Sequence, residues 1–301
     1  MRKLSDGDEG RQAGGDMDVR STGCEMSVFE EPKIDAHCHV LDPARYPYAP
    51  DVAYRPSGQE VSPFEQYQQV MDAYGIRHAL FVGPNSGYST DNRCLLDTLA
   101  RGAGQLRGIA VVRHNATDDE LRALRDAGVI GIALNATVMG TDHCLAAAPL
   151  LRRAAAQGLL LDVQAEGGQW LALEPVLLAF EGRILVDHGG RPLAGAGVRQ
   201  PGFQAVLRLA KTGRVAVKLS GAQKFSQRPP PYDDALPYVH ALIDAYGLGA
   251  CLWASDWPFL KAAQRLDVGP LLRIVERLLP EPAERRRLWW DSPRRWLGFN
   301  D

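Results

Sequence analysis

Several features that would place a protein in a common class are missing from this 301-residue sequence. Its five cysteines stand apart without a Cys-x-x-Cys pair, which argues against a disulfide framework or a zinc knot and favours reduced thiols in a cytoplasmic protein. No run is long and apolar enough to span a bilayer, and the first residues lack the apolar region of a signal peptide. The formal net charge of -2 gives no reason to expect nucleic acid or an anionic membrane as a partner.

Glycine motifs for nucleotide binding are also missing. There is no P-loop, and the segments 102–104 and 195–197 lack a third glycine at the spacing of a dinucleotide-binding loop. This weakens the case for an open, doubly wound sheet, in which a glycine-rich turn follows the first strand.

Composition divides the chain at about residue 30. Residues 1–30 are rich in Gly, Asp, Arg and Ser without apolar periodicity, so we expect a disordered tail that cannot offset its own ordering entropy. The chain is 46% hydrophobic, which is ample for a large core, and we expect residues 31–301 to form a single domain.

Short apolar runs alternate with amphipathic stretches along this domain. The predicted strands are 34–40, 78–82, 106–112, 129–134, 159–163, 184–186, 214–219 and 251–253. The predicted helices are 64–74, 91–101, 117–128, 146–157, 170–180, 201–211, 235–246 and 270–279, the third opening with a Thr117/Glu120 capping box. Eight strands, each followed by a helix or loop, predict an α/β fold of the closed (β/α)8, or TIM-barrel, type.

The first strand carries two histidines that alternation places on one face. His37 and His39 are two residues apart, with Asp35 predicted below them on the same face. Imidazole is the commonest metal ligand and a ready proton carrier, so this strand is suited to the wall of an active site.

Polar residues also end five later strands, where the active site of a barrel lies. Alternation places on the inner face Asn135 and Thr137, Asp162 and Gln164, His188, Lys218 and Ser220, and Asp256. Asp187 is expected to point outward and cap a loop. Lys218 has two open interpretations, as the counter-ion of a buried acid such as Asp35 or Asp162 or as a substrate-binding residue.

Three strand-end segments together resemble the amidohydrolase superfamily. They are His37-Cys38-His39, Asp187-His188-Gly189-Gly190-Arg191-Pro192 and Ser255-Asp256-Trp257-Pro258, and Tyr46-Pro47-Tyr48-Ala49-Pro50 and the closing segment 291–295 add to the likeness. The resemblance is greatest to the lactonase branch that includes the 2-pyrone-4,6-dicarboxylate lactonases. It implies a hydrolase that opens a small lactone, with Asp256 as general base and with His37, His39 and His188 around the carbonyl group.

The sequence departs from this branch in its cations. The pyrone dicarboxylate enzymes have arginines near the positions of Ala133 and Met139 that hold substrate carboxylates. We therefore expect a substrate with at most one carboxylate, or a neutral sugar lactone. The residues expected to bind it are Tyr48, Arg113, Lys218, Lys224, Asn135 and Gln164.

The expected cofactor is either none or one divalent metal ion, with zinc preferred. His37, His39 and Asp256 could hold one ion, with His188 as a further ligand. The resemblance implies a Lys or Glu after the fourth strand and a His after the fifth in two-metal relatives, whereas this chain has Asn135 and Gln164. A metal-free site is equally open, because Lys218 could supply the positive charge.

Other functions remain open from the sequence alone. A single-metal decarboxylase or a sugar-lactone isomerase of the same superfamily would use the same histidines and aspartate. A non-catalytic binding protein is the alternative of another class. The exact substrate and the oligomeric state do not follow from the sequence.

Overall fold

The computed structural model describes residues 26–52 and 54–300. Eight parallel strands follow one another around a single sheet in the order β1 to β8, which confirms the predicted barrel. The strands are β1 (Lys33–Cys38), β2 (Ile76–Val82), β3 (Leu106–Ala110), β4 (Val129–Asn135), β5 (Leu160–Gln164), β6 (Ile184–Val186), β7 (Val215–Leu219) and β8 (Cys251–Trp253).

The barrel closes through the segment that follows β8. The backbone N–H of His39 donates to the carbonyl of Trp257, and the N–H of Asp256 donates to the carbonyl of His37, both at 2.8 Å. Closing the sheet in this way removes exposed strand edges. These two hydrogen bonds also hold His37 and His39, on β1, next to Asp256, which follows β8.

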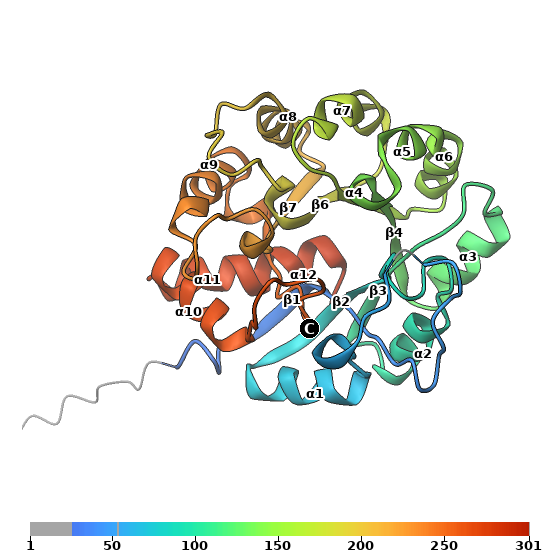
Figure 1. Ribbon diagram of the computed structural model, residues 1–301, viewed down its shortest axis with the longest axis horizontal. Helices are drawn as coiled ribbons and strands as arrows, with labels where there is room; N and C mark the ends of the chain where they lie inside the picture. The colour runs from blue at the N-terminus through green and yellow to red at the C-terminus, as the bar shows by residue number, and fades with distance from the viewer. Residues whose placement is uncertain (1–25, 53, 301) are drawn as a thin grey trace, which may run out of the picture.

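Helices ring the strands, as Figure 1 shows. They are α1 (Phe64–Ala73), α2 (Arg93–Arg101), α3 (Asp118–Asp126), α4 (Ala136–Met139), α5 (Thr141–Ala146), α6 (Ala148–Ala156), α7 (Gln169–Ala179), α8 (Pro201–Leu209), α9 (Leu236–Tyr246), α10 (Val268–Leu278), α11 (Pro282–Arg286) and α12 (Ser292–Leu297), with a π-helical turn at Arg287–Asp291. The predicted capping box opens α3, where the side chains of Thr117 and Glu120 bond to each other's backbone.

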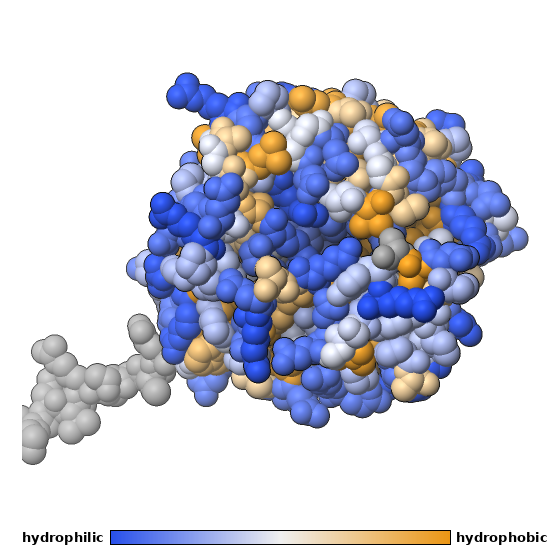
Figure 2. Space-filling model, in the orientation of Figure 1, coloured by the Kyte–Doolittle hydropathy of each residue, from blue (hydrophilic) through white to orange (hydrophobic). Residues whose placement is uncertain are grey.

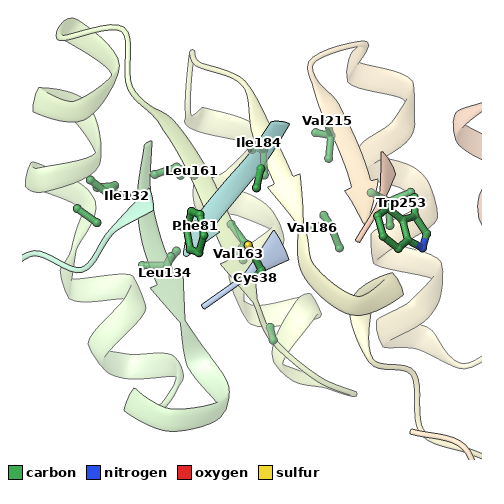
Figure 3. Packing of buried hydrophobic residues seen from close by; sticks show 14 of the residues in the cluster. Cys38, Phe81, Ile132, Leu134, Leu161, Val163, Ile184, Val186, Val215 and Trp253 are labelled. Carbon is green, nitrogen blue, oxygen red and sulfur yellow. The ribbon is translucent and has the colours of Figure 1, made fainter. Parts of the chain in front are cut away.

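Two apolar layers fill the molecule. The outer layer packs the strands against the helices, and Figure 3 shows members such as Phe81, Leu161, Val186 and Trp253. The inner layer fills the barrel itself and includes Ile34, Ala36, Leu80, Ile109, Leu160, Leu185, Ala216, Leu252 and Ala254. Trp296, Leu297 and Phe299, from α12 and the segment after it, join the inner layer and close the lower end of the barrel.

The predicted tail overlaps the described residues only at 26–30; residues 1–25 lie outside them. Val28 is buried in the outer layer, and Phe29 packs edge-on against Tyr74, which follows α1. Packing therefore begins at residue 28. Within the described ranges, no helix has the length and apolar character needed to cross a membrane. The four described cysteines are buried and free.

Candidate active site

A bulge in β1 sets the direction of the two histidines. Asp35 pairs with Ala79 of β2, and the next pair joins Cys38 to Phe81, so two residues of β1 stand opposite one residue of β2. The extra residue of a bulge changes the face that the following side chains occupy. The change falls between Ala36, which belongs to the inner layer, and His37.

The bulge corrects the predicted position of Asp35. His37 and His39 do share a face, but Asp35 points away from it, toward α1 and the segment after β8. Its Oδ2 accepts a hydrogen bond from Tyr67 at 2.6 Å, and its Oδ1 accepts from the backbone N–H groups of Ser255 at 2.9 Å and His37 at 3.0 Å. Burial outweighs these bonds and raises the pKa of Asp35.

The mouth of the barrel holds a cavity of about 400 Å³. The face seen in Figure 2 is hollowed near its middle, where hydrophilic side chains predominate. Seven predicted site residues line the cavity, namely His37, His39, Asn135, Gln164, His188, Lys224 and Asp256. A volume of this size is typical of a site for a small molecule.

Three imidazole rings converge on one carboxylate oxygen in this cavity. The Nε2 atoms of His37, His39 and His188 lie 3.8, 3.9 and 3.8 Å from Oδ1 of Asp256. The Nε2 atoms of His37 and His39 are 3.3 Å apart. Within the described chain, this Oδ1 is buried and has no hydrogen-bond partner. The ligand atoms of His37, His39 and Asp256 are close enough to hold one metal ion.

The outer nitrogens of two rings are held by neighbouring groups. Nδ1 of His39 lies 2.7 Å from the carbonyl oxygen of Val82, so it carries the proton and leaves Nε2 bare. Nδ1 of His188 lies 3.1 Å from the hydroxyl of Ser220. Burial, followed by the nearby charge of His37, lowers the pKa of His39 to about 4, and burial lowers the pKa of His188 well below its usual value. Both rings are therefore neutral at physiological pH.

The turn after β6 brings two neighbouring residues into the site, which corrects the prediction that Asp187 points outward. Leu185 faces the inner layer, and Asp187 continues that alternation, with Oδ1 3.2 Å from Nδ1 of His37. His188 then adopts a left-handed backbone (φ 51°, ψ 44°) that turns its ring into the same cavity. Gly221 passes close by with φ +69°, where a Cβ would lie 2.7 Å from the His188 ring.

Asp256 is held in a fixed orientation. Its backbone is also left-handed, with φ 63°, an uncommon conformation for a residue other than glycine. Its Oδ2 lies 2.9 Å from Nζ of Lys224 and accepts a hydrogen bond from Gln223 at 3.2 Å. Burial alone would raise the pKa of Asp256, but Lys224 and His188 outweigh it and lower the pKa to about 2. Asp256 is thus ionised, with one oxygen anchored and the other directed at the histidines.

A buried cation lies beneath this cluster. Nζ of Lys218 is 2.6 Å from Asp162 Oδ1, 2.8 Å from Asp187 Oδ1 and 3.1 Å from Nδ1 of His37. Burial would lower the pKa of Lys218, but the two carboxylates raise it, so the amine is charged. Lys218 does not line the cavity. The structure thus makes Lys218 the counter-ion of Asp162 and Asp187, with no contact to Asp35.

Amide and hydroxyl groups form one wall of the cavity. Asn135 donates from Nδ2 to Asn85 at 3.2 Å and accepts a hydrogen bond from Thr137 at 2.8 Å. Gln164 donates to the same hydroxyl at 2.9 Å. These amides stand at the strand ends where the resemblance implies a Lys or Glu and a His in two-metal relatives.

Besides Lys218, two further predicted substrate-binding residues are not brought to the cavity wall. Tyr48 packs against Tyr88, with ring centroids 5.3 Å apart, and Arg113 is exposed on the segment after β3. Neither is among the residues that surround the cavity. Their contact with a substrate stays a prediction.

Other residues of the wall were not predicted from the sequence. They are chiefly Asn85, Ser86, Glu166, Arg191, Gln223 and Lys261. Arg191 and Gln223 fall within strand-end segments that the sequence singles out, and Asn85 and Ser86 follow a Gly-Pro pair at the end of β2. Inspecting every strand end for polar residues would have found most of them.

The amidohydrolase family profile matches residues 34–299, and the chain belongs to this family. The predicted resemblance is therefore confirmed, and the chain is an enzyme of amidohydrolase type.

The individual relatives are lactone hydrolases. A 4-sulfomuconolactone hydrolase from Rhizobium radiobacter is 32% identical over 274 residues, covering 88% of this chain and 89% of the relative. A 2-pyrone-4,6-dicarboxylate hydrolase from Comamonas testosteroni is 26% identical, covering 87% and 88%. Among solved structures, a Pseudomonas putida protein assigned as a 2-pyrone-4,6-dicarboxylic acid hydrolase has a TM-score of 0.80 and 30% identity, covering 90% of this chain and 98% of its own.

A more distant structure shares the fold alone. This Burkholderia multivorans amidohydrolase with bound zinc has a TM-score of 0.67 at 19% identity, covering 89% of this chain and 100% of its own.

Proposed function

We propose that the protein hydrolyses a small lactone and that Asp256 is the proton acceptor. The observation that carries this proposal is the convergence of three imidazole Nε2 atoms on one unpaired oxygen of Asp256, at distances of 3.8–3.9 Å. The names of the relatives support the substrate class, since both of the curated relatives described above act on lactones.

The reaction follows from the groups around the cavity. Asp256 takes a proton from a water molecule as the water oxygen bonds to the lactone carbonyl carbon. The ring C–O bond then breaks, and the ring oxygen takes up a proton to give a hydroxy acid. A positive group at the carbonyl oxygen would stabilise the charge that develops there, and His37, His39 and His188 would supply one by holding a cation with their Nε2 atoms.

The low pKa of Asp256, about 2, bears on this role. Such a carboxylate is ionised at neutral pH but is a weak base, so it needs a water molecule that is more acidic than bulk water. Two bare Nε2 lone pairs that face each other at the 3.3 Å between His37 and His39 would also repel without a cation between them. A cation between the two rings would remove this repulsion, as would a proton on Nε2 of His37.

The donor set fits one divalent metal ion. His37, His39 and Asp256 would hold it, with His188 as a further ligand, and nitrogen and carboxylate donors favour zinc. A metal bound there would polarise the carbonyl group and lower the pKa of water. The groups on the outer nitrogens of these histidines, a backbone carbonyl for His39 and side chains for His37 and His188, resemble the supporting contacts that orient ligands in known metal sites.

The cations of the wall favour a substrate with at most one carboxylate. Arg191 pairs with Glu166 at 2.8 Å, and Lys224 pairs with Asp256 at 2.9 Å. Lys261 lies over the ring of Tyr54 and has no carboxylate partner among the described residues. Of these three wall cations, Lys261 alone is thus free to receive an acidic group of the substrate.

A lactone panel tests the proposal. Purified enzyme is offered a neutral sugar lactone, a lactone with one acidic group and 2-pyrone-4,6-dicarboxylate, and proton release is followed at constant pH. We expect turnover of one of the first two and slow turnover of the dicarboxylate. Rapid turnover of the dicarboxylate would contradict the proposed substrate, and release of carbon dioxide would contradict hydrolysis. Elemental analysis of enzyme purified without chelator should find at most one divalent ion per chain.

A further inference from the structure

The surroundings of His37 contain both a proton donor and a proton acceptor for the same ring nitrogen. Nδ1 of His37 lies 3.1 Å from the ammonium of Lys218 and 3.2 Å from Oδ1 of Asp187. An ammonium can only donate a hydrogen bond, and a carboxylate can only accept one. A single nitrogen cannot use both partners at once, because it either carries a proton or presents a lone pair.

The two partners correspond to two tautomers of a neutral ring. When Nδ1 carries the proton, it donates to Asp187, and Nε2 is left bare. When Nδ1 is bare, it accepts from Lys218, and Nε2–H is directed toward Nε2 of His39 at 3.3 Å. Nε2 of His39 is an acceptor, because Nδ1 of the same ring carries the proton and donates it to the carbonyl of Val82. The second state therefore pairs both ring nitrogens of His37, whereas the first pairs Nδ1 and leaves Nε2 free for a ligand.

We propose that Lys218 and Asp187 are a positioning pair that sets the tautomer of His37 and exchanges it when a cation enters the site. In the metal-free protein, Lys218 holds Nδ1 bare, and Nε2–H bonds to His39, which removes the repulsion between two lone pairs. In the loaded protein, the proton stands on Nδ1 and bonds to Asp187, so Nε2 is free to act as a ligand. The proton changes nitrogen, and the net charge of the ring stays the same.

Lys218 acts only through its neighbours, although its partner Asp187 also borders the cavity. Lys218 is fully buried and is absent from the cavity wall, so it cannot contact a substrate. Its remaining partner, Asp162, lies 2.6 Å away and has no hydrogen bond to His37. The proposal rests on the metal site of the proposed function, but it concerns the state of His37, which can be measured without any substrate.

Nitrogen-15 NMR of the full-length protein, labelled at histidine, tests the pair directly. The chain has seven histidines, and loss of a signal pair in His37→Gln identifies the ring of interest. In the metal-free protein, we expect the Nε2–H tautomer, and one equivalent of zinc should convert it to Nδ1–H. A metal-free protein in which His37 already has the Nδ1–H form would overturn the proposal.

Two variants separate the roles of donor and acceptor. Removing Lys218 alone would leave two buried carboxylates facing each other, so the charge-balanced Lys218→Met/Asp162→Asn variant is used. It should show Nδ1–H without metal and bind zinc more tightly than the parent protein. Asp187→Asn should bind zinc 10- to 100-fold more weakly, the usual effect of losing a group that orients a ligand.

The outcomes distinguish this proposal from the proposed function. If the charge-balanced variant keeps the parent tautomer, or if Asp187→Asn binds zinc as tightly as the parent, the pair does not set the tautomer. If the tautomers change as expected while no lactone is turned over, the pair is supported and the lactonase assignment fails. Thermal unfolding of each variant shows whether the fold is kept.

Discussion

Each end of the barrel buries a lysine, and the surroundings shift the pKa values of the two lysines in opposite directions. At the mouth, Lys218 lies between Asp162 and Asp187, and these carboxylates raise its pKa. At the lower end, Nζ of Lys33 donates to the backbone carbonyls of Glu31 at 2.6 Å and Tyr74 at 3.1 Å. Burial there lowers the pKa of Lys33 to about 8.

The inner face of the strands shows the same division. Leu185 of β6, Ala216 of β7 and Leu252 of β8 fill the inner layer, and the polar residues of the same strands stand above them at the mouth. Apolar contacts at the lower end supply stability, whereas the polar groups at the mouth are costly to bury and are kept for chemistry. Changes at the mouth should therefore affect catalysis more than folding, and changes below should do the reverse.

The largest effect is expected for Asp256→Asn. Asn is nearly isosteric but cannot accept the proton, so kcat should fall by about 10²- to 10⁴-fold or more. The variant should stay folded with a lower melting temperature, because the fold stabilises the ionised carboxylate and Lys224 loses its partner. Initial rates and thermal unfolding measure both effects, with the exposed Asp119→Asn as a matched control. A variant that keeps most of its activity would move the proton acceptor to another group.

The opposite result is expected in the lower layer for Leu252→Ala. This side chain is fully buried in the inner layer, so its loss should reduce the free energy of unfolding by about 2–5 kcal/mol. Turnover at a temperature where the variant is folded should change by only a few fold. Denaturant titration measures the loss, and Leu178→Ala on the exposed face of α7 serves as the control. If kcat fell as far as in Asp256→Asn, the two ends could not be regarded as separate.

The sequence predicts the lower part of the barrel better than the mouth. All eight strands follow from apolar alternation, and so do the inward directions of Asp162, Gln164 and Lys218. Alternation fails at Asp35 and at His188 for physical reasons. A bulge changes the face of β1, and a left-handed turn brings His188 into the cavity beside Asp187, which keeps the alternation of β6. Both features depend on backbone conformation that composition does not reveal.

The partners of Lys218 were beyond sequence reasoning for another reason. Asp162 pairs across the sheet with Leu185, and Leu185 pairs with Ala216, two residues before Lys218. Lys218 therefore meets Asp162 only because of the stagger between strands in the closed barrel. The register of two strand pairs must be known before this contact can be predicted.

Shortening the chain tests where the packed lower part begins. Removal of residues 1–25 should leave the melting temperature unchanged, because their composition predicts no contribution to the core. Removal of residues 1–30 also deletes Val28, and the lost burial should cost about 1.5–3 kcal/mol. The two shortened chains control for each other in denaturant titrations. Equal stability of both would show that Val28 contributes nothing.

The smallest effect concerns the pH dependence caused by Lys33. Its pKa is about 8 in the folded protein and 10.5 in an ordinary environment, so the folded chain releases this proton first as the pH rises. Between these two values, the unfolded state binds more protons, and stability therefore increases with pH by at most about 1.4 kcal/mol per unit. Lys33→Met, which keeps the length of the side chain without its charge, should lack this contribution.

Other groups also titrate in this range, so the difference between the parent protein and Lys33→Met is the quantity to measure. Denaturant titrations at pH 7.5, 8.5 and 9.5 should show the parent gaining stability relative to the variant at each step. Lys218 should give no such gain, because its carboxylate partners keep it charged over the same range. A constant difference between parent and Lys33→Met would mean that Lys33 has an ordinary pKa, and the contrast between the two buried lysines would then disappear.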